Sequence, residues 1–137
     1  MTALFVDTSG WFALANGADP VHAASRSARD AHLTRGGILI STDFVMDETL
    51  TLLRVRLGIE AAERWWDLVS RSPRVVWEPI DAGRAQSARA WFFRWRDKEF
   101  SFTDCTSFVV MKELRIRRAL TTDRHFAQAG FLRAPAR

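Results

Sequence analysis

Four acidic residues occupy positions from which secondary structure can bring them together: Asp7, Glu48, Asp104 and Asp123. Asp7 follows the apolar run 3–6, and Asp123 follows the strand-like run 119–122. Ligand sites in open parallel α/β sheets lie outside the carboxyl ends of the strands, so we expect both carboxylates at one edge of the sheet. Oxygen-only ligands of this kind suit a hard divalent cation such as Mg²⁺ or Mn²⁺.

Helical periodicity places the other two acids, because side chains at i, i+3, i+4 and i+7 share one face of a helix. Glu48 shares an arc with Val45 and Val55 on a helix predicted over residues 43–57. Asp104 falls on the apolar face of a later helix. Burial of an ionised carboxylate without a partner costs several kcal/mol. A shared cation would relieve this cost, so the pattern predicts a metal site.

Helix capping is the alternative interpretation, because acids near helix N-termini are favoured without any ligand. Capping accounts for Asp104 or Asp123 taken singly, but it does not account for Asp7 at the end of a buried strand. On the same helical wheel as Glu48, Asp43 and Asp47 project to the polar side, and we do not expect them to be ligands.

Composition is typical of a globular protein. The 137 residues fit one domain spanning 1–137, with 47% hydrophobic residues and six Trp and ten Phe for a core. The start lacks the basic flank and long apolar stretch of a signal peptide, and no run is long enough to span a membrane, so a cytoplasmic protein is expected. The single cysteine, Cys105, excludes an internal disulfide and fits a small buried side chain.

Basic residues exceed acidic ones by 20 to 16, a formal net charge of +4. If four acids gather at one site, the remaining surface is more basic than this value indicates, which suits a polyanionic partner such as RNA. A compositional bias toward arginine would produce the same excess, and charge alone does not separate the two explanations.

The chain alternates predicted strands and helices. Strands are expected over 3–6, 38–40, 75–77 and 119–122, and helices over 9–16, 19–34, 43–57, 59–70, 81–98 and from about 103 onward. Ser9 is expected to cap the first helix, and Pro20 to begin the second. This alternation implies an α/β fold with a central parallel sheet covered on both faces by helices.

The predicted helix 81–98 carries two aromatic faces. Four side chains spaced at i, i+3, i+4 and i+7 are expected in the core or an interface: Ala88, Trp91, Phe92 and Trp95. On the opposite face, Phe93 lies between Arg89 and Arg96 and could contact a second subunit or stack on a base. We favour the subunit contact. Three later arginines, Arg115, Arg117 and Arg118, suit a helix C-terminus.

The acidic motifs resemble those of the PIN-domain nucleases, and more narrowly the VapC-type toxins of bacterial toxin–antitoxin pairs. Asp7-Thr8-Ser9 resembles the family's first acid after the first strand, and Glu48 in Asp47-Glu48-Thr49-Leu50 resembles its helical glutamate. The segment 101–105, with Thr103-Asp104, resembles the third motif, and 122–126, with Thr122-Asp123, resembles the fourth. The match spans nearly the whole chain.

The resemblance implies a PIN-like α/β fold and a Mg²⁺- or Mn²⁺-dependent endoribonuclease. It also implies a homodimer, silenced by an antitoxin protein whose C-terminal segment occupies the active-site groove. We expect Asp7 and Asp104 to bind the principal ion directly, and Glu48 and Asp123 to complete the site through water or a second ion roughly 4 Å away. A water activated at the site would attack the scissile phosphate.

Hydroxyl groups beside the acids could orient the carboxylates, and four are candidates: Thr8, Ser9, Thr103 and Thr122. Helix capping explains Ser9 and Thr122 equally well. His125 lacks a histidine partner and is expected to be a surface or packing residue.

Other classes fit less well. A dehalogenase-type phosphatase needs a second acid where Ser9 stands, a receiver domain needs paired acids near the start, and no P-loop motif is present. A noncatalytic RNA-binding or regulatory scaffold with this fold stays open as the alternative function. Metal-dependent cleavage that requires Asp7 would separate the two.

Overall fold

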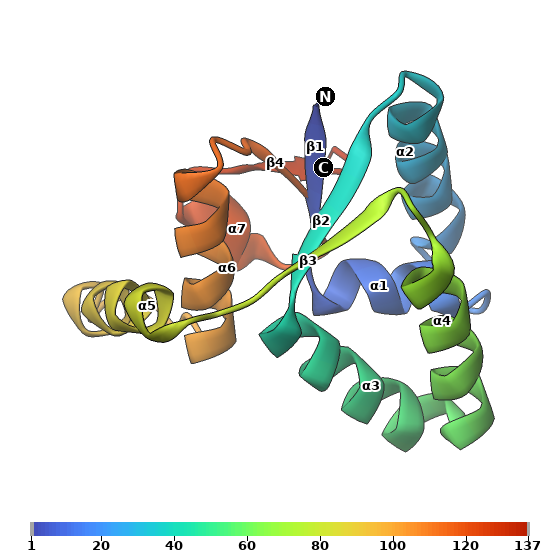
Figure 1. Cartoon of the computed structure of the whole chain (residues 1–137), viewed down its shortest axis with the longest axis horizontal. Coiled ribbons are helices and arrows are strands. Elements are labelled where there is room, and N and C mark those ends of the chain that lie inside the picture. The colour runs from blue at the N-terminus through green and yellow to red at the C-terminus, as the bar shows by residue number, and fades with distance from the viewer. Residues whose placement is uncertain (1, 137) are drawn as a thin grey trace.

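A computed structural model describes residues 2–136 and contains one five-stranded sheet (Figure 1). The strands lie in the order β3-β2-β1-β4-β5, and every neighbouring pair is parallel. Their bounds are β1 Ala3–Val6, β2 Ile38–Thr42, β3 Val75–Glu78, β4 Arg118–Leu120 and β5 Leu132–Ala134. The central position of β1 places Asp7, the next residue, in the middle of the carboxyl edge of the sheet.

Seven helices connect the strands within residues 2–136: α1 Thr8–Ala15, α2 His22–Thr34, α3 Asp43–Leu57, α4 Ile59–Arg71, α5 Ala82–Arg94, α6 Phe102–Glu113 and α7 Arg124–Gln128. Figure 1 shows α1, α2 and α4 on one side of the sheet and α5, α6 and α7 on the other, with α3 extending beyond its carboxyl edge. The predicted α/β class, with a parallel sheet flanked by helices, is therefore confirmed.

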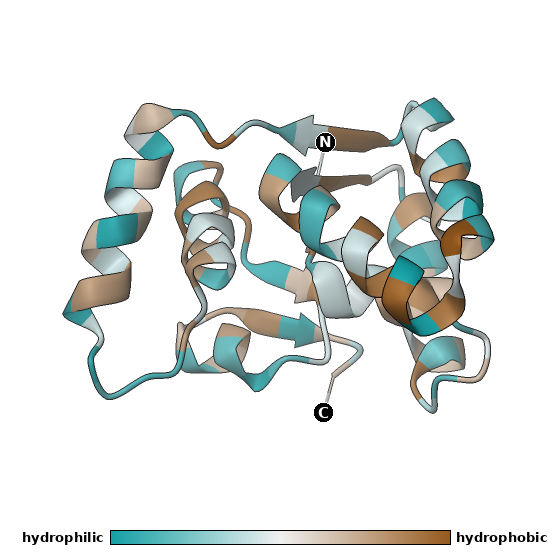
Figure 2. Cartoon of the chain, turned by 90° about the horizontal axis from the view of Figure 1, so that it is seen from below, coloured by the Kyte–Doolittle hydropathy of each residue, from teal (hydrophilic) through white to brown (hydrophobic). Residues whose placement is uncertain are grey.

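The core forms around β1, whose residues Leu4, Phe5 and Val6 are fully buried. Figure 2 shows brown, hydrophobic residues both in the strands and on the helices around them, as expected for parallel strands covered on both faces by helices. Tryptophan fills the space on the α1 side, where the Trp11 ring lies 5.6 Å from that of Trp65. This packing holds α1 against the sheet and so holds the first residues of the candidate site.

Several predicted boundaries were wrong. The N-cap of α1 is Asp7 rather than Ser9, because the Asp7 side chain accepts the hydrogen bond from the backbone N–H of Gly10. Helix α2 begins at His22 rather than at Pro20, and α5 ends at Arg94, four residues before the predicted end. Strand β5, a three-residue element, was not predicted at all, because its pattern is too short to be distinctive.

The aromatic face of α5 is only partly in the core. Ala88 is fully buried and the ring of Trp91 packs 5.4 Å from Phe108, whereas Phe92 and Trp95 are 38% and 42% exposed. Phe93 is 60% exposed, as its opposite-face position predicted. Of the four side chains expected in the core or an interface, only Ala88 and Trp91 therefore lie in the core.

Within residues 2–136, no helix combines the length and apolar character needed to cross a membrane.

Candidate active site

Asp7 is the anchor of the candidate active site. It directly follows β1, and its side chain is buried, with 6% of the residue exposed. One carboxylate oxygen, Oδ1, accepts hydrogen bonds from the Gly10 backbone N–H at 2.8 Å and the Ser9 hydroxyl at 2.9 Å. The other, Oδ2, accepts from the Thr121 hydroxyl at 2.8 Å. These three donors fix the orientation of the carboxylate without any positively charged side chain.

Two of those hydroxyl groups also connect the ends of β1 and β4. The Ser9 Oγ accepts a hydrogen bond from the backbone N–H of Thr122 at 2.9 Å, and the Thr121 Oγ1 accepts from the backbone N–H of Asp123 at 2.9 Å. The same atoms that orient Asp7 therefore position the chain that carries Asp123.

Gly10 lets α1 approach the end of β4 closely. A Cβ atom at this position would overlap the backbone carbonyl oxygen of Leu120, which cannot move without disturbing the sheet. The same residue donates its N–H to Asp7. A residue without a side chain is thus required where the first acid, the first helix and the fourth strand meet.

Asp104 lies near the start of α6 in a capping box. Its backbone N–H donates to the Ser101 hydroxyl at 2.9 Å, and its Oδ2 accepts from the Ser101 backbone N–H at 3.1 Å. The capping alternative is therefore correct for Asp104, and also for Asp123 and Asp7, the N-caps of α7 and α1, although capping was not expected at Asp7. At Asp104 it uses one carboxylate oxygen and leaves Oδ1 free of it. With 14% of its side chain exposed, the residue is also mostly removed from water.

Burial raises the pKa of both acids. For Asp7, desolvation raises the pKa from 3.8 to about 7, although hydrogen bonds from Gly10, Thr121 and Ser9 act in the opposite direction. For Asp104, desolvation also raises the pKa, with a further contribution from the negative charge of Asp123. The site therefore destabilises its own ionised carboxylates, which is the condition under which a bound cation is favourable.

His125 lies between two of the acids, at the start of α7. Its buried Nδ1 atom is 3.1 Å from Asp123 Oδ1 and 3.3 Å from Asp104 Oδ2, without regular hydrogen-bond geometry to either. Its ring packs edge-on against Phe100 at 5.7 Å. The predicted packing role is therefore correct, but the prediction missed that this side chain belongs to the acidic cluster.

Glu48 occupies a different environment from the one predicted. It is exposed on α3, and Val55 on the predicted apolar arc is 75% exposed. Helical periodicity correctly placed Val45, Glu48 and Val55 on one side of α3, but no other element packs against this side at Val55. The Glu48 Oε1 accepts a hydrogen bond from the Thr8 hydroxyl at 2.6 Å, which holds the side chain over the cleft.

A cavity of about 180 Å³ joins these residues. All four predicted acids line it, together with Thr8, Ser9, Val45, Leu52, Thr103 and Ser107. Neither Asp43 nor Asp47 does, as predicted. The tightest potential ligand group within residues 2–136 is formed by Asp104, Asp123 and His125, whose ligand atoms all lie within 4.8 Å of one another.

The predicted orienting hydroxyls were correct in part. Thr8 and Ser9 contact carboxylates as expected, whereas Thr103 lines the cavity without such a hydrogen bond. Thr122 contributes its backbone N–H, and the orienting hydroxyl belongs to Thr121 instead. The sequence contained no clear signal for Thr121, because it lies inside the predicted strand 119–122 beside consecutive buried residues rather than in an alternating pattern.

Comparisons with known proteins agree with this geometry. The PIN domain family model matches residues 4–132. The 23S rRNA-specific endonuclease VapC20, from two strains of Mycobacterium tuberculosis, is 35% identical over 129 residues that cover 94% of this chain and 95% of the relative.

Solved structures show the same likeness. The crystal structure of Mycobacterium tuberculosis VapC20, described as a sarcin–ricin loop cleaving toxin, superposes with a TM-score of 0.87 at 33% identity and covers 94% of this chain and 96% of that one. FitAcB from Neisseria gonorrhoeae, at 13% identity, a TM-score of 0.66 and 96% coverage of both chains, shares the fold. The chain therefore belongs to the PIN domain family, among the VapC-type toxins that its acidic motifs resemble.

Proposed function

We propose that this protein is a metal-dependent endoribonuclease that hydrolyses RNA phosphodiester bonds and acts as the toxin of a toxin–antitoxin pair. The observation that carries the proposal is the single cavity lined by Asp7, Glu48, Asp104 and Asp123 in a PIN-domain chain. The 35% identity to an rRNA endonuclease supports RNA as the substrate class and 23S rRNA as the first target to test.

The residues of the cavity fit a hard divalent cation. Its donors are mainly carboxylates, with the His125 imidazole beside Asp104 and Asp123. The two most buried acids, Asp7 and Asp104, both have a raised pKa because desolvation disfavours their charge. We assign these two as direct ligands of the principal ion, with Glu48 and Asp123 completing the site through water or a second ion. Mg²⁺ is the expected ion, with Mn²⁺ as a substitute. Such an ion supplies Lewis-acid stabilisation of phosphate charge and a lowered pKa for water.

The protein's own residues position this chemistry. Ser9 and Thr121 hold the Asp7 carboxylate in one orientation, and Thr8 holds Glu48 on the other side of the cavity. His125 lies against Asp104 and Asp123, with its Nδ1 within 3.3 Å of an oxygen of each carboxylate. These contacts fix the acids before substrate arrives, which reduces the reorganisation needed during the reaction.

The partners follow from the same proposal. RNA is the substrate, a cognate antitoxin protein is the inhibitor, and the cytoplasm, where ribosomal RNA lies, is the place of action. Two copies of the chain are expected to form a homodimer. The exposed aromatic side chains of α5, Phe92, Phe93 and Trp95, are the candidate contact between them.

The test is cleavage by protein freed of any bound partner. Structured 23S rRNA fragments and single-stranded RNAs are incubated with EDTA, Mg²⁺ or Mn²⁺. We expect cleavage only when Mg²⁺ or Mn²⁺ is present. The cleavage rate should fall at least about a hundredfold in the Asp7→Asn and Asp104→Asn variants, which is the size of single catalytic electrostatic contributions. Asp47→Asn is the matched control, since this exposed acid lies on the same helix as Glu48 but outside the cavity.

Cleavage by both Asn variants at the wild-type rate would contradict the assignment of Asp7 and Asp104 as metal ligands and would indicate a contaminating nuclease. RNA binding without cleavage under every metal condition would favour the noncatalytic scaffold instead.

A further inference from the structure

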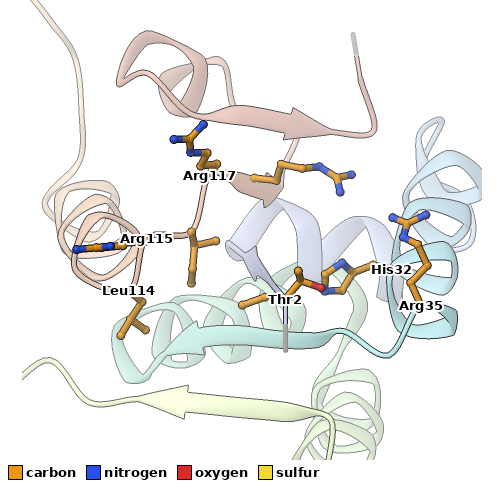
Figure 3. Close-up of a pocket in the computed structure, with 9 residues that line it drawn as sticks. Thr2, His32, Arg35, Leu114, Arg115 and Arg117 are labelled. Atoms are coloured by element: carbon orange, nitrogen blue, oxygen red, sulfur yellow. The ribbon is translucent and has the colours of Figure 1, made fainter.

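A second cavity, of about 460 Å³, lies at the opposite edge of the sheet from the candidate active site (Figure 3). Its wall includes Ala3 at the start of β1 and Arg118 at the start of β4. The four residues of β1 separate it from the acidic edge by about 13 Å, taking about 3.3 Å per residue. This cavity belongs to a different surface from the catalytic acids.

Arginine dominates the wall of this cavity. Four arginines contribute to it: Arg35, Arg115, Arg117 and Arg118. Figure 3 shows Arg35, at the end of α2, and Arg117, before β4, on opposite sides of the cavity. We call this feature the rear arginine pocket. Arg115, Arg117 and Arg118 were predicted only to suit a helix C-terminus. The tertiary structure also brings them into one cavity with Arg35, which comes from a distant segment of the chain.

None of the four arginines has a carboxylate within 4 Å among residues 2–136. By contrast, Arg84 lies 2.9 Å from both Glu78 and Glu113. Figure 3 shows the Arg115 side chain directed away from Thr2, so the arginines surround the cavity rather than all pointing into it. Unpaired positive charges around one cavity create a local positive potential that favours an anion with more than one negative charge.

Arg115 occupies a backbone position that normally favours glycine. Its φ is 57°, and it follows the C-cap of α6, where its N–H donates to the carbonyl of Lys112 at 3.2 Å. The N–H of the next residue, Ile116, donates to the carbonyl of Met111 at 2.8 Å. This pair of bonds is the Schellman motif, in which glycine is the usual residue at the position of Arg115. Local folding therefore does not explain an arginine here.

The basic surface continues beyond the rear arginine pocket. Arg115 and Arg117 also line an adjoining cavity of about 510 Å³, to which Lys112 contributes as well. Basic side chains thus follow a path across two cavities, longer than a single phosphate ion requires. Guanidinium groups bind phosphate oxygens through paired N–H donors.

We propose that the rear arginine pocket binds backbone phosphates of the RNA substrate at a distance from the cleavage site. The inference rests on the proposed function, because it takes RNA to be the substrate. A large structured RNA reaches both edges of the sheet, whereas a short oligonucleotide held at the acids does not reach the pocket. The pocket therefore contributes affinity for long RNA and leaves cleavage of short RNA unchanged.

The test compares two double variants in an Asp7→Asn background that binds RNA without cleaving it. Arg115→Gly/Arg117→Ala removes two exposed arginines of the pocket, and Arg56→Ala/Arg64→Ala removes two exposed arginines on α3 and α4. Binding of a long 23S rRNA fragment and of a dinucleotide RNA, which is too short to span the distance of about 13 Å between the two edges, is measured over a salt series. Thermal melting checks folding, and Arg115→Gly should not lower the melting temperature, since glycine favours this φ.

We expect the pocket variant to bind the long RNA roughly tenfold more weakly, with the salt slope reduced by about 1.5 to 2, because two phosphate contacts are lost. Binding of the short RNA should not change, and with Asp7 restored its cleavage should not change either. Equal losses in the α3–α4 control, or unchanged binding in the pocket variant, would overturn the proposal.

Inorganic tripolyphosphate separates a small anion from RNA as the ligand. If tripolyphosphate binds the intact pocket, while the protein with the intact pocket and the Arg115→Gly/Arg117→Ala variant bind long RNA with the same salt slope, the pocket is a small-anion site and the RNA proposal is wrong. The proposed nuclease function is tested separately, by whether the wild-type protein cleaves RNA in the presence of metal and the Asp7→Asn and Asp104→Asn variants do not, whatever the binding results.

Discussion

At Asp7, burial and hydrogen bonding act on the carboxylate in opposite directions, and burial has the larger effect. Three donors stabilise the ionised form, yet desolvation still raises the pKa to about 7. A proton and a cation therefore compete for the same side chain, so divalent metal should bind more tightly as the pH rises through this value. The pKa of Cys105, raised to about 12 by burial, keeps its thiol out of this competition.

The first prediction concerns the stability of the metal-free protein. The pKa of Asp7 is raised on folding, from 3.8 to about 7, so between these values the folded state binds more protons than the unfolded state. Its contribution to stability is fully present below about pH 4 and is lost as the pH rises toward 7, by roughly 4 kcal/mol at 1.36 kcal/mol per pKa unit. Asp7→Asn, which has no such titration, should gain stability relative to wild type over this range.

Urea unfolding in EDTA at about pH 4.5 and about pH 7.5 measures this difference. Asp47→Asn is the control, because its exposed carboxylate has no such burial to relieve. If the stability difference between wild type and Asp7→Asn is the same at both pH values, the inference that burial strongly raises the pKa of Asp7 is wrong.

At the scale of elements, the site depends on how closely α1 approaches β4. The hydroxyls of Ser9, on α1, and Thr121, after β4, both reach Asp7, and this geometry requires the absence of a side chain at Gly10. The sheet order explains the requirement, because β4 lies directly beside β1 and the helix that follows β1 starts against the end of β4. A small outward movement of one helix would therefore separate the acids.

The second prediction tests this packing with Gly10→Ala. The added methyl group meets the Leu120 carbonyl, so we expect a loss of about 1–3 kcal/mol in the free energy of unfolding, typical of overpacked sites. Binding of Mn²⁺, followed by calorimetry, should weaken as Asp7 moves. Gly17→Ala is the control, because a Cβ there meets no atom within 4 Å. Equal stability of the two variants would show that the α1–β4 approach is not tight.

At the scale of the whole molecule, α5 is a sparsely covered helix, with Ala88 as the one buried residue of Ala82–Arg94. It packs on α6 through Ala88 and Trp91, and its far end carries exposed aromatic rings, with Phe92 and Phe93 5.3 Å apart at their centroids. Exposed apolar patches of this kind often mark protein–protein contacts. The candidate dimer contact lies close to the acidic edge, because the Phe92 ring packs 6.1 Å from Phe102, the residue before the cavity-lining Thr103.

The third prediction is that Phe93→Ala weakens self-association at least tenfold in sedimentation experiments, because truncation of a hot-spot aromatic costs about 2 kcal/mol or more and about 1.4 kcal/mol already corresponds to tenfold. Leu68→Ala, at a 74% exposed position on α4, should leave association unchanged. Unchanged association in Phe93→Ala, together with weaker RNA binding, would favour base stacking over the subunit contact.

The sequence by itself determined the fold class and the positions of the acids. Strands such as 3–6 are continuous apolar runs, and a parallel sheet brings their carboxyl ends to one edge, so Asp7 and Asp123 could be placed together from local pattern alone. The acidic motifs were also sufficient to predict the PIN family, which the comparisons confirm. Local periodicity carries this information because it depends on neighbours within a few residues.

Only the tertiary structure decided what surrounds each acid. Thr121 donates to Asp7 across 114 positions of sequence, and His125 lies between two acids from different elements. Periodicity indicates that residues share a helix face, but it does not say whether anything packs there, which is why Glu48 is exposed. The gathering of Arg35 with Arg117 has the same cause, because strand order, not spacing, brings their segments to one edge.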